Sequence, residues 1–144
     1  MKRTLIIATA IASVIGFTSL PASANDLFIQ QFGFANSAGG GQMGWDNTIG
    51  VHQDGAWNDA VSEQFGNDNV AATGQQGFNN SSTTTQFGNW NAAGVGQFGD
   101  NHTSVMSQDG NGNVAAGVQV GNNCSANVSQ SGGGNTAAFV QVCP

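Results

Sequence analysis

Two cysteines and two histidines are the side chains in this sequence that could carry covalent or metal chemistry. Cys124 and Cys143 lie close together near the end of the chain, and His102 precedes them. In an oxidising compartment we expect an intrachain disulfide, which would close a loop of about 20 residues and stabilise the fold by roughly 3 kcal/mol. The alternatives are free or intersubunit thiols, and a soft metal site formed by His102 with both cysteines.

A catalytic site is not expected. Serine is abundant, but His52 and His102 are the only histidines, and no acidic residue recurs at a fixed position beside either one. A nucleophilic triad needs one unique convergent geometry, whereas this sequence offers many copies of one unit. The sequence therefore predicts a protein that is not an enzyme and that holds no cofactor or resident metal.

The elements that position these side chains follow a repeat of eleven residues. Glutamine recurs at an unbroken spacing of eleven, and a short fixed period of this kind indicates one small unit stacked on itself. Glycine stands two residues after each of the first ten glutamines, from Gly33 to Gly132. The glutamines are Gln31, Gln42, Gln53, Gln64, Gln75, Gln86, Gln97, Gln108, Gln119, Gln130 and Gln141.

Asparagine forms a second series in the same period, five residues after the glutamines. Only His102 and Cys124 interrupt it, and the seventh residue after each of the first ten glutamines is Ala or Ser, with Ile49 as the exception. The series begins at Asn25, which lies six residues before Gln31, the same spacing as from Asn36 to Gln42. The asparagines are Asn25, Asn36, Asn47, Asn58, Asn69, Asn80, Asn91, Asn113 and Asn135.

Each unit is predicted to be one strand and one turn. In the segment from Asn69 to Gln75, alternate side chains share one face, which carries Asn, a small residue, a variable residue and Gln. The four residues between such segments, for example 65–68, are rich in Gly, Asn and Asp, which tolerate positive φ. A helix with an eleven-residue period is the alternative, and the repeated glycine disfavours it by roughly 1 kcal/mol at each copy.

Two units make a flat rung of 22 residues, so the sequence predicts an all-β β-solenoid of about five and a half rungs with cross-β stacking. Stacking places Asn on Asn and Gln on Gln at about 4.8 Å, where side-chain amides can pair with their copies in a dry interface. Without that register, buried amides would be costly. In one sheet Phe139 is expected to lie over Gly117, which compensates for its size.

Residues 1–24 are predicted to be a secretory signal peptide, and residues 25–144 the solenoid. Lys2 and Arg3 precede an apolar run, and the segment ends in an A-x-A cleavage pattern. The run is short for a membrane anchor, which needs about 20 apolar residues. Cleavage would remove both basic residues and change the formal net charge from −6 to −8. No nucleic-acid partner is therefore expected, because nothing would neutralise its phosphates.

Both ends of the array repeat the interior motif. The segments 25–31 and 135–141 follow the same pattern as the units between them. The end strands of an open solenoid present unpaired N–H and C=O groups. Each end is therefore predicted to act as a template for the other.

The unit Gln-x-Gly-x-x-Asn-x-Ala-x-x-x-Gln resembles the curlin repeat. The segment from Gln31 to Gln42 matches it residue for residue, as do the units that begin at Gln53, Gln64 and Gln86. The resemblance implies a β-solenoid subunit of curli, the extracellular functional amyloid fibre of bacterial biofilms. Such a subunit is secreted unfolded through an outer-membrane pore with accessory factors. It then polymerises end to end at the cell surface, where it serves in biofilm matrix, adhesion and cell aggregation.

Within that family the chain is more similar to the major subunit than to the nucleator, because nucleators tend to carry basic residues in their last repeats. The implied partners are further copies of this chain and a homologous nucleator or major subunit. Two alternatives stay open, namely a minor nucleator and a soluble solenoid that binds ice or carbohydrate on a flat face. The outward positions after each Asn are too irregular for the Thr ladder that an ice-binding face needs.

Overall fold

The computed structural model describes residues 25–144, and the predicted signal peptide lies outside the described residues. In this part of the chain no helix is long and apolar enough to cross a membrane. Eleven strands follow one another along the chain. They are β1 (Asp26–Phe34), β2 (Ser37–Met43), β3 (Thr48–Ala56), β4 (Asp59–Phe65), β5 (Val70–Phe78), β6 (Ser81–Phe87), β7 (Ala92–Asp100), β8 (Thr103–Asn111), β9 (Val114–Asn122), β10 (Ser125–Gly133) and β11 (Thr136–Cys143).

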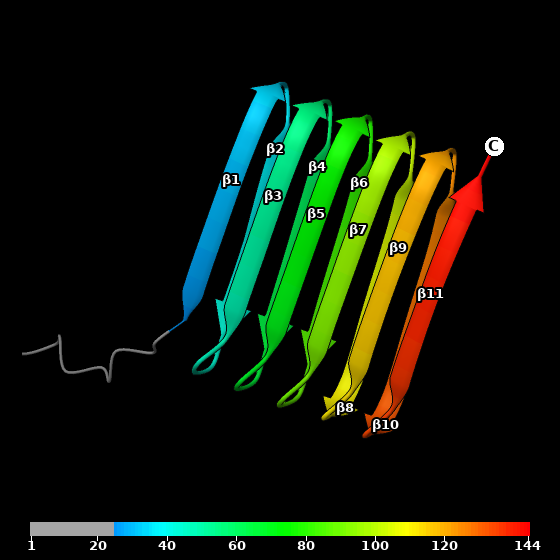
Figure 1. Ribbon diagram of the computed structural model, residues 1–144. Helices are drawn as coiled ribbons and strands as arrows, with labels where there is room; N and C mark the ends of the chain where they lie inside the picture. The colour runs from blue at the N-terminus through cyan, green and yellow to red at the C-terminus, as the bar shows by residue number, and fades with distance from the viewer. Residues whose placement is uncertain (1–24) are drawn as a thin grey trace, which may run out of the picture.

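The strands form two parallel sheets that lie face to face (Figure 1). The odd strands make a six-stranded sheet in the order β1-β3-β5-β7-β9-β11, and the even strands make a five-stranded sheet. Each residue pairs with its equivalent one rung later, as Ile49 does with Ala71 and Gln53 with Gln75. The predicted all-β solenoid with 22-residue rungs is therefore confirmed, with eleven strands placed two to a rung.

The strand bounds differ from those predicted. We expected strands from each Asn to the next Gln and turns of four residues. Instead the strands begin one residue after the Asn and end one to three residues past the Gln, as β3 does around Gln53. The backbone bends at Gly55 with φ of 124°, yet Gly55 still pairs with Gly77. Pairing persists because stacked copies bend alike, so their N–H and C=O groups stay opposed.

The repeated glycine after each Gln is required by close approach between rungs. At Gly77 φ is 129°, and a Cβ added there would lie 2.0 Å from the carbonyl oxygen of Gly99 in the next rung. Any other residue would have to push the rungs apart at this corner, in a conformation that side chains disfavour. The glycine therefore sets the rung spacing at the turns.

The space between the sheets holds a thin core of small clusters. One cluster contains Ile49 and Val51, and a second contains Met106 with Phe139 partly buried beside it. A Cβ on Gly117 would lie 2.1 Å from the Phe139 ring. This contact is the size compensation that the sequence predicts.

Candidate assembly site: the amide ladders and the open ends

The glutamines form one hydrogen-bonded ladder in each sheet. Nε2 of each Gln donates to Oε1 of the Gln one rung later, at distances of 2.6 to 3.0 Å. The ladders run from Gln31 to Gln141 in the six-stranded sheet and from Gln42 to Gln130 in the five-stranded sheet. Since each donor points toward the later rung, every Gln ladder has a direction.

The second N–H of the glutamine side chain ties the two sheets together. Nε2 of Gln75 donates to the backbone carbonyl of Asp59 on the opposite sheet, at 2.9 Å, and Gln86 does the same to Val70 at 3.0 Å. Gln75 and Gln86 are almost completely buried. Full pairing of both N–H groups and the oxygen removes the penalty of burying a primary amide.

The asparagine ladders run in the opposite direction. Oδ1 of Asn47 accepts the backbone N–H of Asn69 at 3.1 Å and its Nδ2–H at 3.0 Å. Nδ2 of Asn69 also donates to the carbonyl of Gly88 at 2.8 Å. Within the ladders, Gln side chains therefore donate to the Gln of the next rung toward the C-terminal end of the solenoid, and Asn side chains donate to the Asn of the previous rung toward the N-terminal end.

His102 replaces one asparagine in the five-stranded sheet and keeps the backbone part of the ladder. Its N–H donates to Oδ1 of Asn80 at 3.0 Å, and its Nδ1 accepts the N–H of Cys124 at 3.1 Å. Nε2 lies 3.1 Å from the carbonyl oxygen of Phe98, so the tautomer with its proton on Nε2 satisfies both ring nitrogens. The imidazole thus supplies the acceptor that an Asn would supply.

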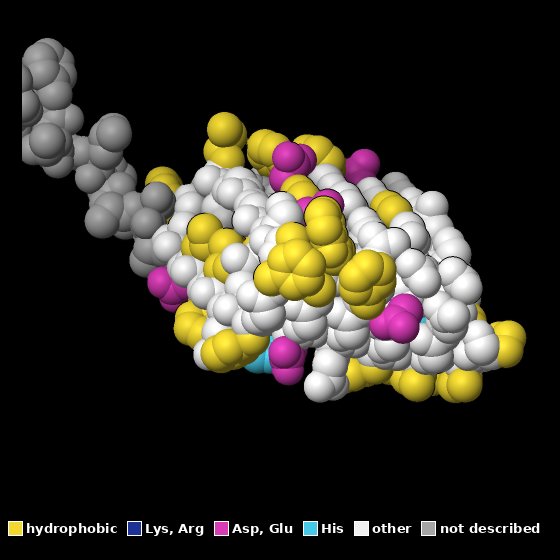
Figure 2. Space-filling model, turned by 90° about the horizontal axis from the view of Figure 1, so that it is seen from above, with side chains coloured by type: hydrophobic (Ala, Val, Ile, Leu, Met, Phe, Trp, Pro, Cys, Tyr) yellow, Lys and Arg dark blue, Asp and Glu magenta, His cyan; other side chains and the backbone are white. Residues whose placement is uncertain are grey.

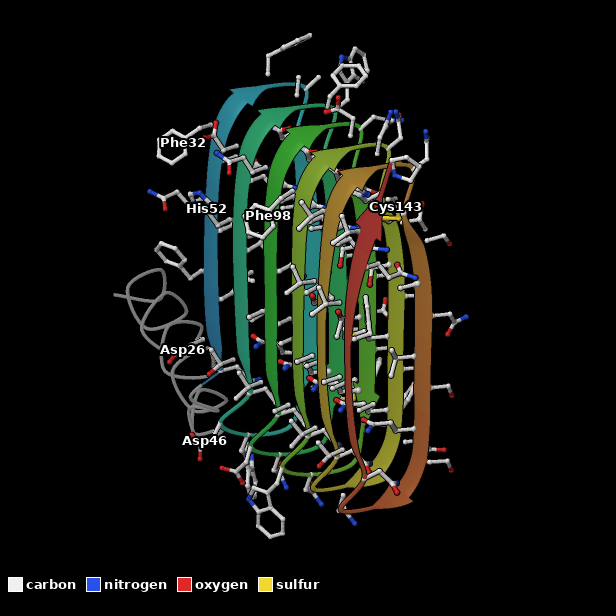
Figure 3. The ribbon with its side chains drawn as sticks, turned by 45° about the vertical axis from the view of Figure 1, so that its right-hand side comes forward. Asp26, Phe32, Asp46, His52, Phe98 and Cys143 are labelled. Carbon is white, nitrogen blue, oxygen red and sulfur yellow. A yellow bond between two sulfur atoms is a disulfide. The ribbon has the colours of Figure 1, made fainter. Side chains whose placement is uncertain are left out.

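At the last position of the same ladder, Cys124, a covalent bond replaces a hydrogen bond. Cys124 is joined to Cys143 by a disulfide, with a Cα–Cα distance of 5.7 Å (Figure 3). Cys143 occupies the glycine position after Gln141, and elsewhere the Asn side chain donates to that glycine's carbonyl, as Asn113 does to Gly132 at 3.0 Å. The disulfide therefore takes the place of a repeated hydrogen bond and fastens β11 to the turn before β10.

The metal alternative does not fit this arrangement. With their sulfurs bonded to each other, Cys124 and Cys143 offer no thiolate to a metal beside His102. Among residues 25–144, no group of three or more His, Cys, Asp or Glu side chains is placed to hold an ion.

The N-terminal end of the solenoid leaves apolar side chains uncovered. Leu27 and Ile29 lie in register with the buried Ile49 and Val51, so they point between the sheets. They are nevertheless 52% and 38% exposed. The sequence analysis did not predict this exposure. The signal for it is the presence of bulky residues at the inward positions of the first strand, where no earlier rung covers them.

The two ends carry complementary amide groups. Within the described residues, Oε1 of Gln31 and of Gln42 accepts no hydrogen bond, because each ladder starts there. At the other end, among the partners in residues 25–144, Nε2 of Gln130 and of Gln141 donates only to a backbone carbonyl and keeps one N–H. Asn135 lies at the end of its ladder, and no donor in the described part of the chain bonds to its Oδ1. The unpaired Gln oxygens at the N-terminal end thus match the unpaired Gln N–H groups at the C-terminal end.

The outer surfaces offer less specific features. Figure 3 shows Phe32, His52 and Phe98 projecting from the outer face of the six-stranded sheet. A shallow groove of about 380 Å³ runs beside them over Gly50, Ala72 and Gly94. At the edge where the odd strands end, hydrophobic and acidic side chains are interspersed (Figure 2), and residues 25–144 contain no Lys or Arg.

These features define a class of protein: a β-solenoid held by amide ladders and open at both ends. The family model of the curlin associated repeat matches residues 22–55, 44–77 and 77–110. These matches cover more than half of the chain, and the chain belongs to the curlin-repeat family. The family and its solenoid fold are structural rather than enzymatic. No curated protein matches the chain.

Proposed function

We propose that this protein is a structural subunit of a curli-type functional amyloid fibre, which polymerises at the bacterial cell surface for biofilm matrix, adhesion and cell aggregation. Membership of the curlin-repeat family supports this function. The observation that carries it is that both ends of the solenoid are open and complementary. Leu27 and Ile29 are uncovered at one end, and free Gln N–H groups stand at the other.

Stacking of copies would relieve both kinds of exposure at once. A strand added to an open edge pairs its N–H and C=O groups, extends the Gln ladder by one bond and covers inward apolar side chains. Burial of apolar area contributes roughly 25 cal/mol per Å². Because the gain repeats at every new end, growth continues rather than closing at a dimer.

The proposed route places the protein outside the cell. A signal peptide at residues 1–24 would direct export, and an outer-membrane pore with accessory factors would complete secretion. A homologous nucleator would start the fibre. The absence of Lys and Arg from residues 25–144 favours the main subunit over the nucleator.

The test is assembly of purified residues 25–144 after removal of denaturant, followed by thioflavin fluorescence, electron microscopy and fibre diffraction. We expect fibrils with a meridional spacing of about 4.7–4.8 Å and a lag that seeds shorten, as for a main subunit. Ile29→Lys, which places a charge on the uncovered end, should slow growth, whereas Gln30→Lys on the outer face of the same strand should have little effect. A stable monomer at high concentration with seeds would contradict the proposal and favour a binding module.

A further inference from the structure

The two sheets have different numbers of strands, and this constrains how one copy can follow another. The open edges at the C-terminal end are β10 and β11, and those at the N-terminal end are β1 and β2. If the next copy were placed by translation alone, its β1 would pair with β11. Its β2 would then be separated from β10 by the width of one missing strand, because the six-stranded sheet is one strand longer.

We infer that successive copies are related by a half-turn about the fibre axis, so that β1 of the next copy pairs with β10 and its β2 pairs with β11. This inference rests on the proposed function and adds the geometry of the joint. A half-turn about an axis perpendicular to the strands reverses strand direction and exchanges the two sheets. Since consecutive strands run in opposite directions, parallel pairing in register is kept across the joint, and no strand position stays empty.

The amide ladders favour the same joint. With the half-turn, Gln130 donates to Gln31 of the next copy and Gln141 donates to Gln42, so both free N–H groups are used. Asn36 of the next copy falls on the free Oδ1 of Asn135. Translation alone would extend only the Gln141 ladder and leave Gln130 facing the gap.

The side chains that face inward also match. In the half-turn joint, Phe139 lies next to Gly40 of the next copy within the sheet, and on its other side it already packs over Gly117. The large ring is thus flanked by glycine on both sides. β11 also faces β1 of the next copy across the core, where it covers the exposed Leu27 and Ile29. In the translated arrangement these two side chains would face the empty strand position.

One ladder position at the joint differs from the interior. Asn25 of the next copy falls on Cys124, whose sulfur is bonded to Cys143 and offers no amide oxygen. The half-turn thus uses the Gln ladders of both sheets but only one Asn ladder. Across the joint, the five-stranded sheet continues through Gln130 and through the backbone of β10.

Paired cysteines on the outer faces test the joint in assembled fibres of residues 25–144. Gln30, Gly41, Ser129 and Val140 occupy the same outward position on β1, β2, β10 and β11, and a side chain at Gly41 meets nothing within 4 Å. Neighbouring parallel residues lie about 4.8 Å apart, within disulfide range. After mild oxidation, covalent multimers are read on a denaturing gel without reductant.

The half-turn predicts multimers for Gln30→Cys/Ser129→Cys and for Gly41→Cys/Val140→Cys. Translation predicts them for Gln30→Cys/Val140→Cys instead, and neither arrangement links Gly41→Cys/Ser129→Cys, which serves as the matched control. Multimers from the translation pair, or fibres in which no pair links, would overturn the half-turn while leaving fibre formation intact. If the unmodified chain forms no fibres by electron microscopy, the proposed function itself fails.

Discussion

The six-stranded and five-stranded sheets are built from one repeating unit, yet they treat the asparagine position differently. In the first sheet the ladder is Asn from Asn25 to Asn135, whereas in the second it passes through His102 and ends at Cys124. The Gln ladders, by contrast, are unbroken in both sheets. A Gln uses three hydrogen bonds and joins the two sheets, while His102 shows that the Asn position needs mainly an acceptor for the next backbone N–H.

The outer faces of the two sheets also differ. Near the C-terminal end the six-stranded sheet exposes Val118, Val120, Val140 and Val142, whereas β10 in the five-stranded sheet is rich in serine. Long, flat apolar faces favour lateral pairing of fibrils. With a half-turn at each joint, apolar and polar faces alternate along the fibre, so that no continuous dry stripe forms.

The largest expected effect comes from cutting the Gln ladder of the six-stranded sheet, which is also bonded to the opposite sheet. Gln75→Ala removes the bonds to Gln53, Gln97 and Asp59 and should lower stability by about 3 kcal/mol or more. Gln76→Ala, at the exposed neighbouring position, is the matched control and should change little. The measurement is the guanidinium concentration at the midpoint of fibre dissolution. Equal midpoints for the two variants would show that the Gln ladder does not contribute to stability.

Removing the disulfide should give the next largest loss of stability. The loss should be confined to the end of the Asn ladder in the five-stranded sheet. Cys124→Ser/Cys143→Ser should destabilise the chain by about 3 kcal/mol, since the loop is no longer closed. Cys124→Asn/Cys143→Gly restores the hydrogen bond of the other units and should recover about 1 kcal/mol. The measurements are the denaturation midpoints of the two variants and that of the wild type with and without reductant. An unchanged midpoint for the wild type in reductant would contradict this role.

A smaller loss is expected from filling the space at Gly117 in the six-stranded sheet. Gly117→Ala puts a methyl group against the Phe139 ring and should cost about 1–3 kcal/mol. Gly94→Ala, where the added Cβ meets nothing within 4 Å, is the control on the same sheet. Adding Phe139→Val to Gly117→Ala should recover stability in thermal unfolding, and failure to do so would place the strain elsewhere.

Repairing the Asn ladder at His102 should give a modest gain. His102→Asn adds an Nδ2 donor that can reach Oδ1 of Asn80 and the carbonyl of Gly121, as at equivalent positions, for about 1 kcal/mol. His52→Asn on the exposed outer face is the control and should be nearly neutral. Denaturant midpoints compare the two, and a loss of stability in His102→Asn would mean that the buried imidazole contributes more through packing.

The smallest effect is expected at a buried hydroxyl of the five-stranded sheet. Oγ of Ser104 is buried and has no hydrogen-bond partner among residues 25–144, and alanine already occupies the equivalent positions Ala60 and Ala126. Ser104→Ala should therefore raise stability by up to about 1 kcal/mol. A clear loss in the same unfolding assay would indicate that the hydroxyl is paired.

Much of the architecture could be read from the eleven-residue period alone. Because side chains in a strand alternate and identical units stack, the spacing predicts the pairing of Gln53 with Gln75 and the division of units between two sheets. The strand bounds could not be read in this way. The chain bends at Gly55 as the sequence suggests, but backbone pairing continues through the bend because all rungs bend together.

The sequence by itself determined the unit, the register and the number of strands, since these follow from which residues recur and how often. Only the tertiary structure decided the opposite directions of the Gln and Asn ladders, because direction depends on how each amide rotates toward its neighbours. The same holds for the use of His102 Nδ1 as an acceptor and for the exposure of Leu27 at the end. These properties depend on the neighbours that each side chain meets across the core and in the adjacent rungs. The spacing of residues in a repeat does not specify those contacts.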